Sequence, residues 1–180
     1  GITAISNCAF YSCNSLSSVR LLNSLTQIPS ECFRNCSNLR SVKLPNNLQT
    51  IGYCAFYSCS RLDSITLPSS INSIETYAFY GCDALQYANI TDLGAWCRIA
   101  FGNETSNPFR FAHHFHLNGE EITELVIPSD ITSIGQYAFH GCSHISSVII
   151  PDNVQSVEVN AFMYCSNLAS VSLGANIVNL

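Results

Sequence analysis

The sequence predicts an α/β solenoid, in which a right-handed coil stacks short repeated units. The first observation is a motif, apolar-x-x-apolar-x-apolar-Pro, which reads L-D-S-I-T-L-P at Leu62–Pro68. The second is its spacing, because its first apolar residue returns at a constant 23-residue period that a single 37-residue interval interrupts. A fixed period in the twenties with this strand signature is typical of leucine-rich repeats. The seven positions are Leu16, Leu39, Leu62, Leu85, Ile122, Ile145 and Leu168.

The strand of each unit is expected to form one wall of the coil. Side chains alternate along a strand, so Leu39, Val42 and Leu44 should point inward, and Ser41 and Lys43 outward. A proline follows the strand in four units and ends its pairing, because proline has no backbone N–H to donate. We expect about seven short parallel strands on the concave face, roughly 4.8 Å apart.

The other half of each unit carries two repeated columns. A phenylalanine recurs six times, and a cysteine lies three residues after each phenylalanine. We expect both columns to face inward from short helical or 3-10 turns on the convex face, with the cysteines packed as reduced thiols. Disulfides stay geometrically open, since equivalent positions on neighbouring coils lie roughly 5 Å apart. The columns are Phe10, Phe33, Phe56, Phe79, Phe139 and Phe162, with Cys13, Cys36, Cys59, Cys82, Cys142 and Cys165.

Composition and charge limit the possible functions. The 180 residues suit one domain, residues 1–180, and 47% are hydrophobic, which is enough to bury a core. A net charge of −5 argues against nucleic-acid partners, whose binders carry basic surfaces. The sequence has no apolar run long enough to predict a membrane span. The chain opens and closes inside a repeat, which suggests a piece of a longer protein whose targeting signals would lie elsewhere.

One unit breaks the period. The 37-residue coil at about 85–121 lacks the A-F-x-x-C signature. Asp92 is a candidate cap for a short helix that contains Trp96. Towards the end of the coil, His114 and His116 predict an added strand, which turns at Asn118–Gly119.

Two interpretations of this irregular coil stay open. A long excursion from a regular array is a place where function concentrates, since connecting segments carry many binding sites. Alternatively, the coil is a self-packed plug with Trp96, Phe101 and Phe109 as its private core. The sequence does not decide between them.

Candidate binding residues follow from these two regions. Solenoids commonly bind partners on the concave face, and Tyr and Arg are favoured interface anchors. Most outward sheet positions are small and neutral, so a merely solvated face is the alternative. The candidates are Arg20, Lys43 and Tyr87 on the sheet, with Trp96, Phe109, Arg110, His114 and His116 in the long coil.

Catalytic and metal chemistry find little support. His114 and His116 would share one face of a strand, and with His113 and Cys97 they make a zinc site conceivable. Neither C-x-x-C nor H-E-x-x-H is present, and no nucleophile elbow, phosphate loop or dinucleotide fingerprint occurs. We therefore expect no enzyme activity, no cofactor and no bound metal.

The repeated pattern A-F-x-x-C-x-x-L-x-S-V-x-L-P resembles the BspA-like class of leucine-rich repeats. It is present from Ala55 to Pro68 and from Ala138 to Pro151, and six units in phase extend the likeness over almost the whole chain. The resemblance implies a bacterial protein of the cell surface or the extracellular space. It further implies a non-catalytic interaction or adhesion module, whose partner is a protein or a glycan on host or neighbouring cells.

Two other functions remain as alternatives. The array could be a structural spacer that displays another domain, or, third in order, a metal-binding or enzymatic module. The family motif defines no binding residues, and the ligand and the oligomeric state stay open.

Overall fold

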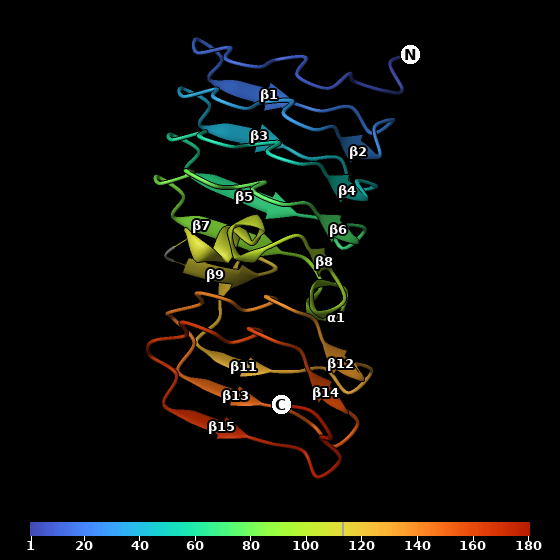
Figure 1. The fold of residues 1–180 in the computed structure, drawn as a ribbon, viewed down its shortest axis with the longest axis vertical. Coiled ribbons are helices and arrows are strands. Elements are labelled where there is room, and N and C mark those ends of the chain that lie inside the picture. The colour runs from blue at the N-terminus through green and yellow to red at the C-terminus, as the bar shows by residue number, and fades with distance from the viewer. Residues whose placement is uncertain (113) are drawn as a thin grey trace.

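The computed structural model describes residues 1–112 and 114–180, which coil into a stack of similar turns (Figure 1). Six strands along one side of the N-terminal part form a sheet in the order β1-β3-β5-β7-β9-β10. Neighbours in this sheet are parallel, except that β10 is antiparallel to β9. The strands are β1 (Ser18–Arg20), β3 (Ser41–Lys43), β5 (Ser64–Leu67), β7 (Tyr87–Ile90), β9 (His114–Leu117) and β10 (Glu120–Glu121).

The C-terminal units form a separate parallel sheet in the order β11-β13-β15. These strands continue the stack below β9 in Figure 1. The parallel stacking of repeated units confirms the solenoid that the repeat period predicts. The strands are β11 (Glu124–Val126), β13 (Ser147–Ile149) and β15 (Ser170–Ser172).

A second layer of two-residue strands runs alongside these sheets. It consists of a four-stranded ladder, β2-β4-β6-β8, and a two-stranded ladder, β12-β14, and all of its pairs are parallel. The strands are β2 (Gln27–Ile28), β4 (Thr50–Ile51), β6 (Ser73–Ile74), β8 (Ala100–Phe101), β12 (Ser133–Ile134) and β14 (Ser156–Val157).

Tight turns, rather than regular helices, form the opposite wall of a repeat unit. The N–H of Tyr57 donates within its own turn, to the carbonyl of Cys54 at 3.1 Å. The N–H of Phe56 instead donates to Ala78 in the next coil, at 2.8 Å. Cys54 and Ser58 have positive φ angles of 52° and 55°, which no right-handed helix contains. The expected helical turns are absent from this unit because every second backbone N–H donates to the next coil and not within its own turn.

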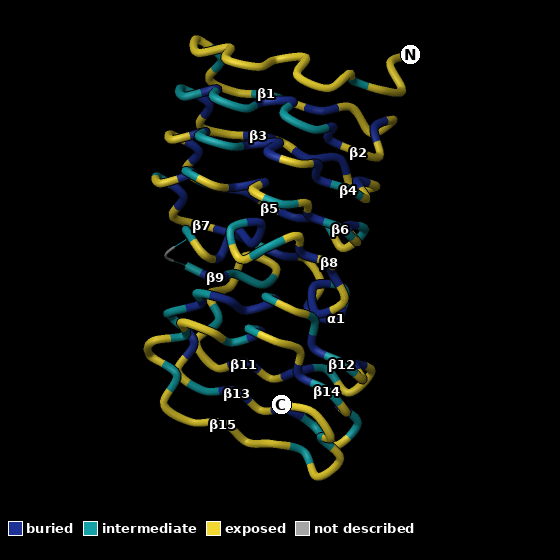
Figure 2. The backbone as a smooth tube through the Cα atoms, in the orientation of Figure 1, coloured by how far each residue is buried: buried dark blue, intermediate teal, exposed yellow. Residues whose placement is uncertain are grey.

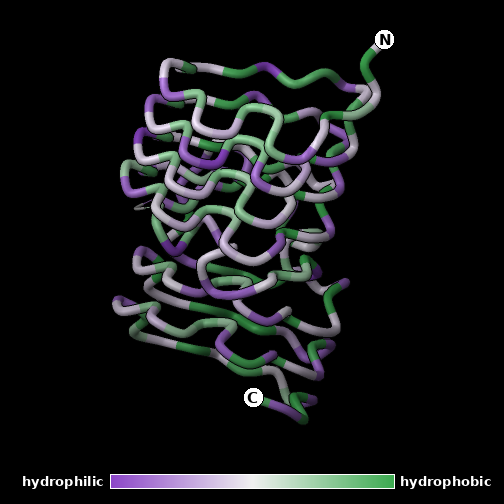
Figure 3. The backbone as a smooth tube through the Cα atoms, turned by 45° about the horizontal axis from the view of Figure 1, so that its top comes forward, coloured by the Kyte–Doolittle hydropathy of each residue, from purple (hydrophilic) through white to green (hydrophobic). Residues whose placement is uncertain are grey.

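The phenylalanine column lies in the core, as the repeat pattern predicts. Phe33, Phe56 and Phe79 are 0% exposed, and their rings stack at 5.6 and 5.4 Å between centroids. Figure 2 shows burial concentrated in the inner coils and exposure in the first and last ones. Phe10, in the first coil, is accordingly 39% exposed. Figure 3 shows hydrophobic segments that recur from coil to coil.

The cysteine column packs beside the phenylalanines as free thiols. All ten cysteines are unbridged. The thiol of Cys59 donates to the carbonyl of Phe33 at 3.1 Å, and the thiol of Cys82 donates to that of Phe56 at 3.2 Å. Burial raises the pKa of Cys59 to about 12, and it raises the pKa of Cys82 well above its ordinary value. These thiols therefore stay protonated at neutral pH, and only the thiolate form is a good nucleophile.

This burial predicts how fast each cysteine reacts with iodoacetamide. In the native protein at pH 8, Cys8 and Cys13 are expected to react first, because both are exposed, whereas Cys59 and Cys82 are buried. Mass spectrometry of peptides after timed quenching measures the order. A sample unfolded in urea is the control and should gain ten labels. Early labelling of Cys59 in the native protein would contradict the closed core.

The long interval contains an additional coil and a hairpin. His114, which begins β9, pairs in register with Tyr87, the first residue of β7. The chain then turns back at Asn118–Gly119, where φ is 55° and 86°, into β10. Asp92 caps the predicted helix through its side chain. A bilayer-spanning helix is not found in the described part of the chain. The helical segments are α1 (Leu93–Cys97), η1 (Glu104–Ser106) and η2 (Pro108–Arg110).

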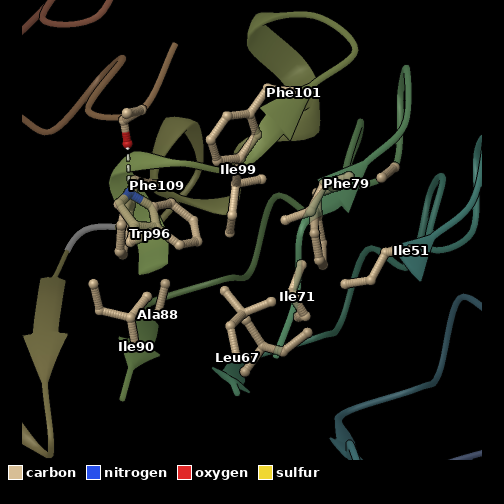
Figure 4. Packing of buried hydrophobic residues seen from close by; sticks show 14 of the residues in the cluster. Ile51, Leu67, Ile71, Phe79, Ala88, Ile90, Trp96, Ile99, Phe101 and Phe109 are labelled. Carbon is tan, nitrogen blue, oxygen red and sulfur yellow. Dashed lines mark hydrogen bonds between the residues drawn. The ribbon is translucent and has the colours of Figure 1, made fainter. Parts of the chain in front are cut away.

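The long coil joins the N-terminal units to the C-terminal ones. The indole N–H of Trp96 donates to the carbonyl of Ala138 at 2.7 Å (Figure 4). The side-chain amide of Asn107 donates to the same carbonyl at 3.0 Å. The N–H of Gly135 donates to the carbonyl of Cys97 at 2.8 Å. A Cβ at position 135 would lie 2.8 Å from that oxygen, so this close approach requires glycine.

Candidate functional site

The solvent side of β1, β3, β5, β7 and β9, called here the outer sheet face, carries the outward positions that strand alternation predicts. Register pairing arranges these residues in columns, with Arg20 beside Lys43 and Tyr87 beside His114. The neighbouring inward residues, such as Val42 and Ala88, are buried. Five of the eight candidate residues lie on this face: Arg20, Lys43, Tyr87, His114 and His116.

Arg20 and Lys43 line a groove at the carboxyl ends of the first strands. Two hollows of about 380 and 350 Å³ share Lys43 and Asn46 in their linings. Arg20 lines the smaller hollow and Thr66 the larger one. The groove thus offers the cationic side chains of Arg20 and Lys43, together with an amide and a hydroxyl group. Such hydrogen-bond donors can bind carboxylates and backbone carbonyls of a partner.

An exposed cluster of rings occupies the other end of the same face. The ring of Tyr87 stacks on His114, with 5.2 Å between centroids and 18° between planes. His116 lies against the same tyrosine at 5.6 Å and 59°. Tyr87 is 47% exposed, so the stack holds its ring in place and leaves it open to a partner. An ordered, exposed aromatic ring loses little conformational entropy when it binds.

The other three candidates lie away from this face. Trp96 and Phe109 are 2% and 1% exposed, with 4.8 Å between ring centroids, so neither ring is accessible to a partner. The interpretation of the coil as a plug describes them better, with the correction that they join the common core (Figure 4). Arg110 is exposed and lies over the ring of Tyr164 at 5.5 Å, in a different cluster.

The zinc site that the sequence suggested is not assembled from the described residues. Cys97 is buried, and burial raises the pKa of its thiol to about 12. His113 lies outside the described residues. His114 instead contacts Glu121, whose Oε1 lies 2.6 Å from the imidazole Nδ1. This hydrogen bond lowers the pKa of the Glu121 carboxyl.

A second aromatic surface was not predicted from the sequence. Side chains at the position after the repeated phenylalanine stack along the turns, joined by two further tyrosines, and we call this surface the tyrosine ridge. The guanidinium of Arg34 lies between two of the rings, 5.8 Å from Tyr11 and 4.7 Å from Tyr57. Tyr57 stacks on Tyr80 at 5.0 Å. The sequence does show a tyrosine directly after the repeated phenylalanine in three of six units. This position varies among the units, which is typical of an ordinary surface position. The ridge comprises Tyr11, Arg34, Tyr53, Tyr57, Tyr77 and Tyr80.

The stacked parallel coils and the open sheet face define a leucine-rich-repeat solenoid. A family model described as the BspA type leucine rich repeat region matches in six copies, over residues 1–107 and 111–180. The chain therefore belongs to the BspA-type leucine-rich-repeat family, whose repeats are typically protein-interaction modules.

Several solved structures are similar to this chain. A leucine rich repeat protein of T. pallidum is 26% identical, with a TM-score of 0.48, over 93% of this chain and 61% of that one. A leucine rich cell surface protein from Faecalibacterium prausnitzii is 20% identical, with a TM-score of 0.39, over 92% and 62%. A leucine-rich repeat protein from Bacteroides ovatus is 18% identical, with a TM-score of 0.44, over 97% and 65%. The chain thus spans less than two thirds of each. Among curated proteins no significant match was found.

Proposed function

We propose that this chain is a non-catalytic interaction module that binds a protein partner through the outer sheet face. The observation that carries the proposal is the exposed Tyr87 ring, held by its stack on His114. The basic groove at Arg20 and Lys43, at the other end of the same face, supports it, because arginine and aromatic residues are enriched in interface hot spots. Membership in a family of interaction repeats supports the same function.

We further propose that the module belongs to an exported protein of the cell surface and contributes to adhesion to host or neighbouring cells. Support comes from the repeat family, in which these properties are expected. A glycan is the second class of partner, since exposed Tyr rings also stack on sugars. A spacer that displays another domain would bind neither class through this face.

Single substitutions test the binding face better than a deletion of residues 94–116. That deletion would remove β8, most of β9 and the buried Trp96 and Phe109, so it would unfold the coil regardless of binding. The first step is a surface plasmon resonance screen of the intact chain against purified extracellular-matrix proteins, run beside a glycan array. The second step measures the affinity of variants for whatever binds.

Tyr87→Ala is expected to weaken binding by about 2 kcal/mol, or roughly thirtyfold in Kd, the size of a hot-spot truncation. Tyr80→Ala on the tyrosine ridge is the matched control, because Tyr80 is 45% exposed and Tyr87 is 47%. Its affinity should equal that of the unchanged protein. If Tyr80→Ala loses binding and Tyr87→Ala keeps it, the tyrosine ridge is the site. Sugars as the sole ligands would establish the glycan alternative, and a screen without any binder would favour the spacer.

A further inference from the structure

Three side chains with metal-ligating atoms meet where the long coil approaches the C-terminal units. His114, Glu121 and His144 each offer one donor atom, and these atoms all lie within 4.8 Å of one another. The imidazole of His114 lies close to both of the other side chains. Its Nδ1 lies 2.6 Å from Oε1 of Glu121, and its ring centroid lies 4.9 Å from that of His144.

The hairpin explains why these residues meet. The turn at Asn118–Gly119 makes β10 antiparallel to β9 and places Glu121 opposite His116. His116 and His114 are alternate residues of β9, so their side chains share the face on which Glu121 also lies. His144 follows Glu121 by one repeat in the sequence, and so belongs to the next coil.

The set of donors suits Zn²⁺. Two imidazoles and one carboxylate are a known three-residue zinc set, which leaves a fourth position for water. Tetrahedral bonds of about 2.0–2.2 Å would place the donors roughly 3.4 Å apart. The donor atoms already lie within 4.8 Å of one another, so side-chain shifts of up to about 1.4 Å would form the site. The stack of His114 on Tyr87 holds the first imidazole in place, and such support keeps a ligand near its productive geometry.

The surroundings favour a cation. The side chains of His114 and Glu121 are 37% and 41% exposed, so an ion can enter from solvent. Residues 91–180 contain eight of the twelve acidic residues of the chain and two of its seven basic ones.

We propose that His114, Glu121 and His144 bind one Zn²⁺ ion, which fastens the β9–β10 hairpin to the C-terminal units. Among the described residues, no strand pairing joins the two main sheets between the hairpin and the C-terminal units, since β10 belongs to the six-stranded sheet and β11 to the three-stranded one. A metal ion would thus connect two coils that strand pairing does not join here. Binding through Nδ1 of His114 would replace its hydrogen bond to Glu121, because imidazole must be unprotonated at the ligating nitrogen. The proposal does not rest on the protein-binding function, although His114 also stacks on Tyr87.

Isothermal titration of the full chain with zinc chloride, after treatment with EDTA and dialysis, tests the site. The expected result is one ion per chain, checked by elemental analysis, and a higher thermal unfolding midpoint with zinc. Glu121→Gln and His144→Asn should each raise the Kd by roughly tenfold or more, since even outer-shell partners of a metal are worth 10–100-fold.

Glu120→Gln is the matched control. Glu120 is the neighbouring carboxylate in β10, but its side chain lies on the opposite face. This variant should bind zinc as tightly as the unchanged chain and gain the same thermal shift. Circular dichroism of each zinc-free variant verifies that it is folded. Substoichiometric zinc in the unchanged protein, or equal affinity in Glu121→Gln and Glu120→Gln, would overturn the proposal.

Discussion

Replacing Phe56 with alanine is expected to lower the free energy of unfolding by about 3–5 kcal/mol, the usual range for a truncated core aromatic. Phe56 is 0% exposed, and its ring stacks between those of Phe33 at 5.6 Å and Phe79 at 5.4 Å. The substitution therefore leaves a cavity with ring faces on two sides, in the middle of the stack. Each unit depends on its neighbours for burial, so the lost contacts affect three coils at once. Equilibrium unfolding in urea measures the change.

Phe10→Ala is the matched control within the same column. Phe10 is 39% exposed, and it stacks against Phe33 at 5.4 Å. Less apolar area returns to water and no enclosed cavity forms, so the loss should stay below about 2 kcal/mol. Equal losses for the two variants would contradict the assignment of Phe56 to a closed core. Comparing the urea m-values will show whether the stack still unfolds as one unit.

The coil and its two columns could be predicted because the repeat makes their signal visible many times. Each regular unit presents the same alternating strand and the same Phe and Cys positions. A pattern that recurs in register can be satisfied by stacking, and stacking fixes which side chains face inward. Parallel pairing of Ser18 with Ser41, or of Ser64 with Tyr87, follows directly from that repeat.

The geometry of the turns could not be predicted in the same way. Cys54, Ser58 and Tyr77 all have φ between 52° and 62°, although glycine is the usual residue in that region. Their residue types carry no such signal. Hydrogen bonds between coils impose the conformation, because alternate N–H groups reach the next coil, as Phe56 does to Ala78. Tertiary pairing overrides the local preference for a helical turn.

The long coil shows where sequence reasoning about the site ends. Its strand at His114 and its turn at Asn118–Gly119 were predictable from local residue types. The burial of Trp96 was not predictable, because aromatic residues are common both in protein cores and in binding interfaces. The approach of His144 to His114 depends on the path of the whole coil. Only the spacing of Glu121 and His144, one repeat apart, was visible beforehand.

Raising the pH above 9 is expected to unfold the protein because of its buried cysteines. Burial raises the pKa of Cys59 from 9.0 to about 12, and the pKa values of Cys32 and Cys97 likewise to about 12. Above pH 9 the unfolded thiols lose their protons and the folded ones keep them. The unfolded state then binds fewer protons, so the free energy of unfolding falls as pH rises. The stabilisation is complete below pH 9 and is lost by about pH 12.

The size of this effect follows from linkage. Each such cysteine lowers the free energy of unfolding by about 1.4 kcal/mol per pH unit within this window. Three of them together remove about 4 kcal/mol per unit, which within two units is comparable to the whole stability of an ordinary domain. Far-ultraviolet circular dichroism should therefore show cooperative loss of structure between about pH 10 and 11.

Cys59→Ser separates the thiol from other groups that ionise in alkali. The serine hydroxyl can donate to the carbonyl of Phe33 as the thiol does, and it stays protonated throughout this range. The variant should be less stable at pH 7. In alkali, however, its free energy of unfolding should fall less steeply with pH than that of the unchanged protein, and the two slopes should differ by about 1.4 kcal/mol per pH unit. Cys13→Ser makes the same substitution at the exposed first position of the column and is the matched control. Tyrosine ionisation is common to all three proteins, so an identical slope in Cys59→Ser would show that buried thiols do not cause the alkaline unfolding.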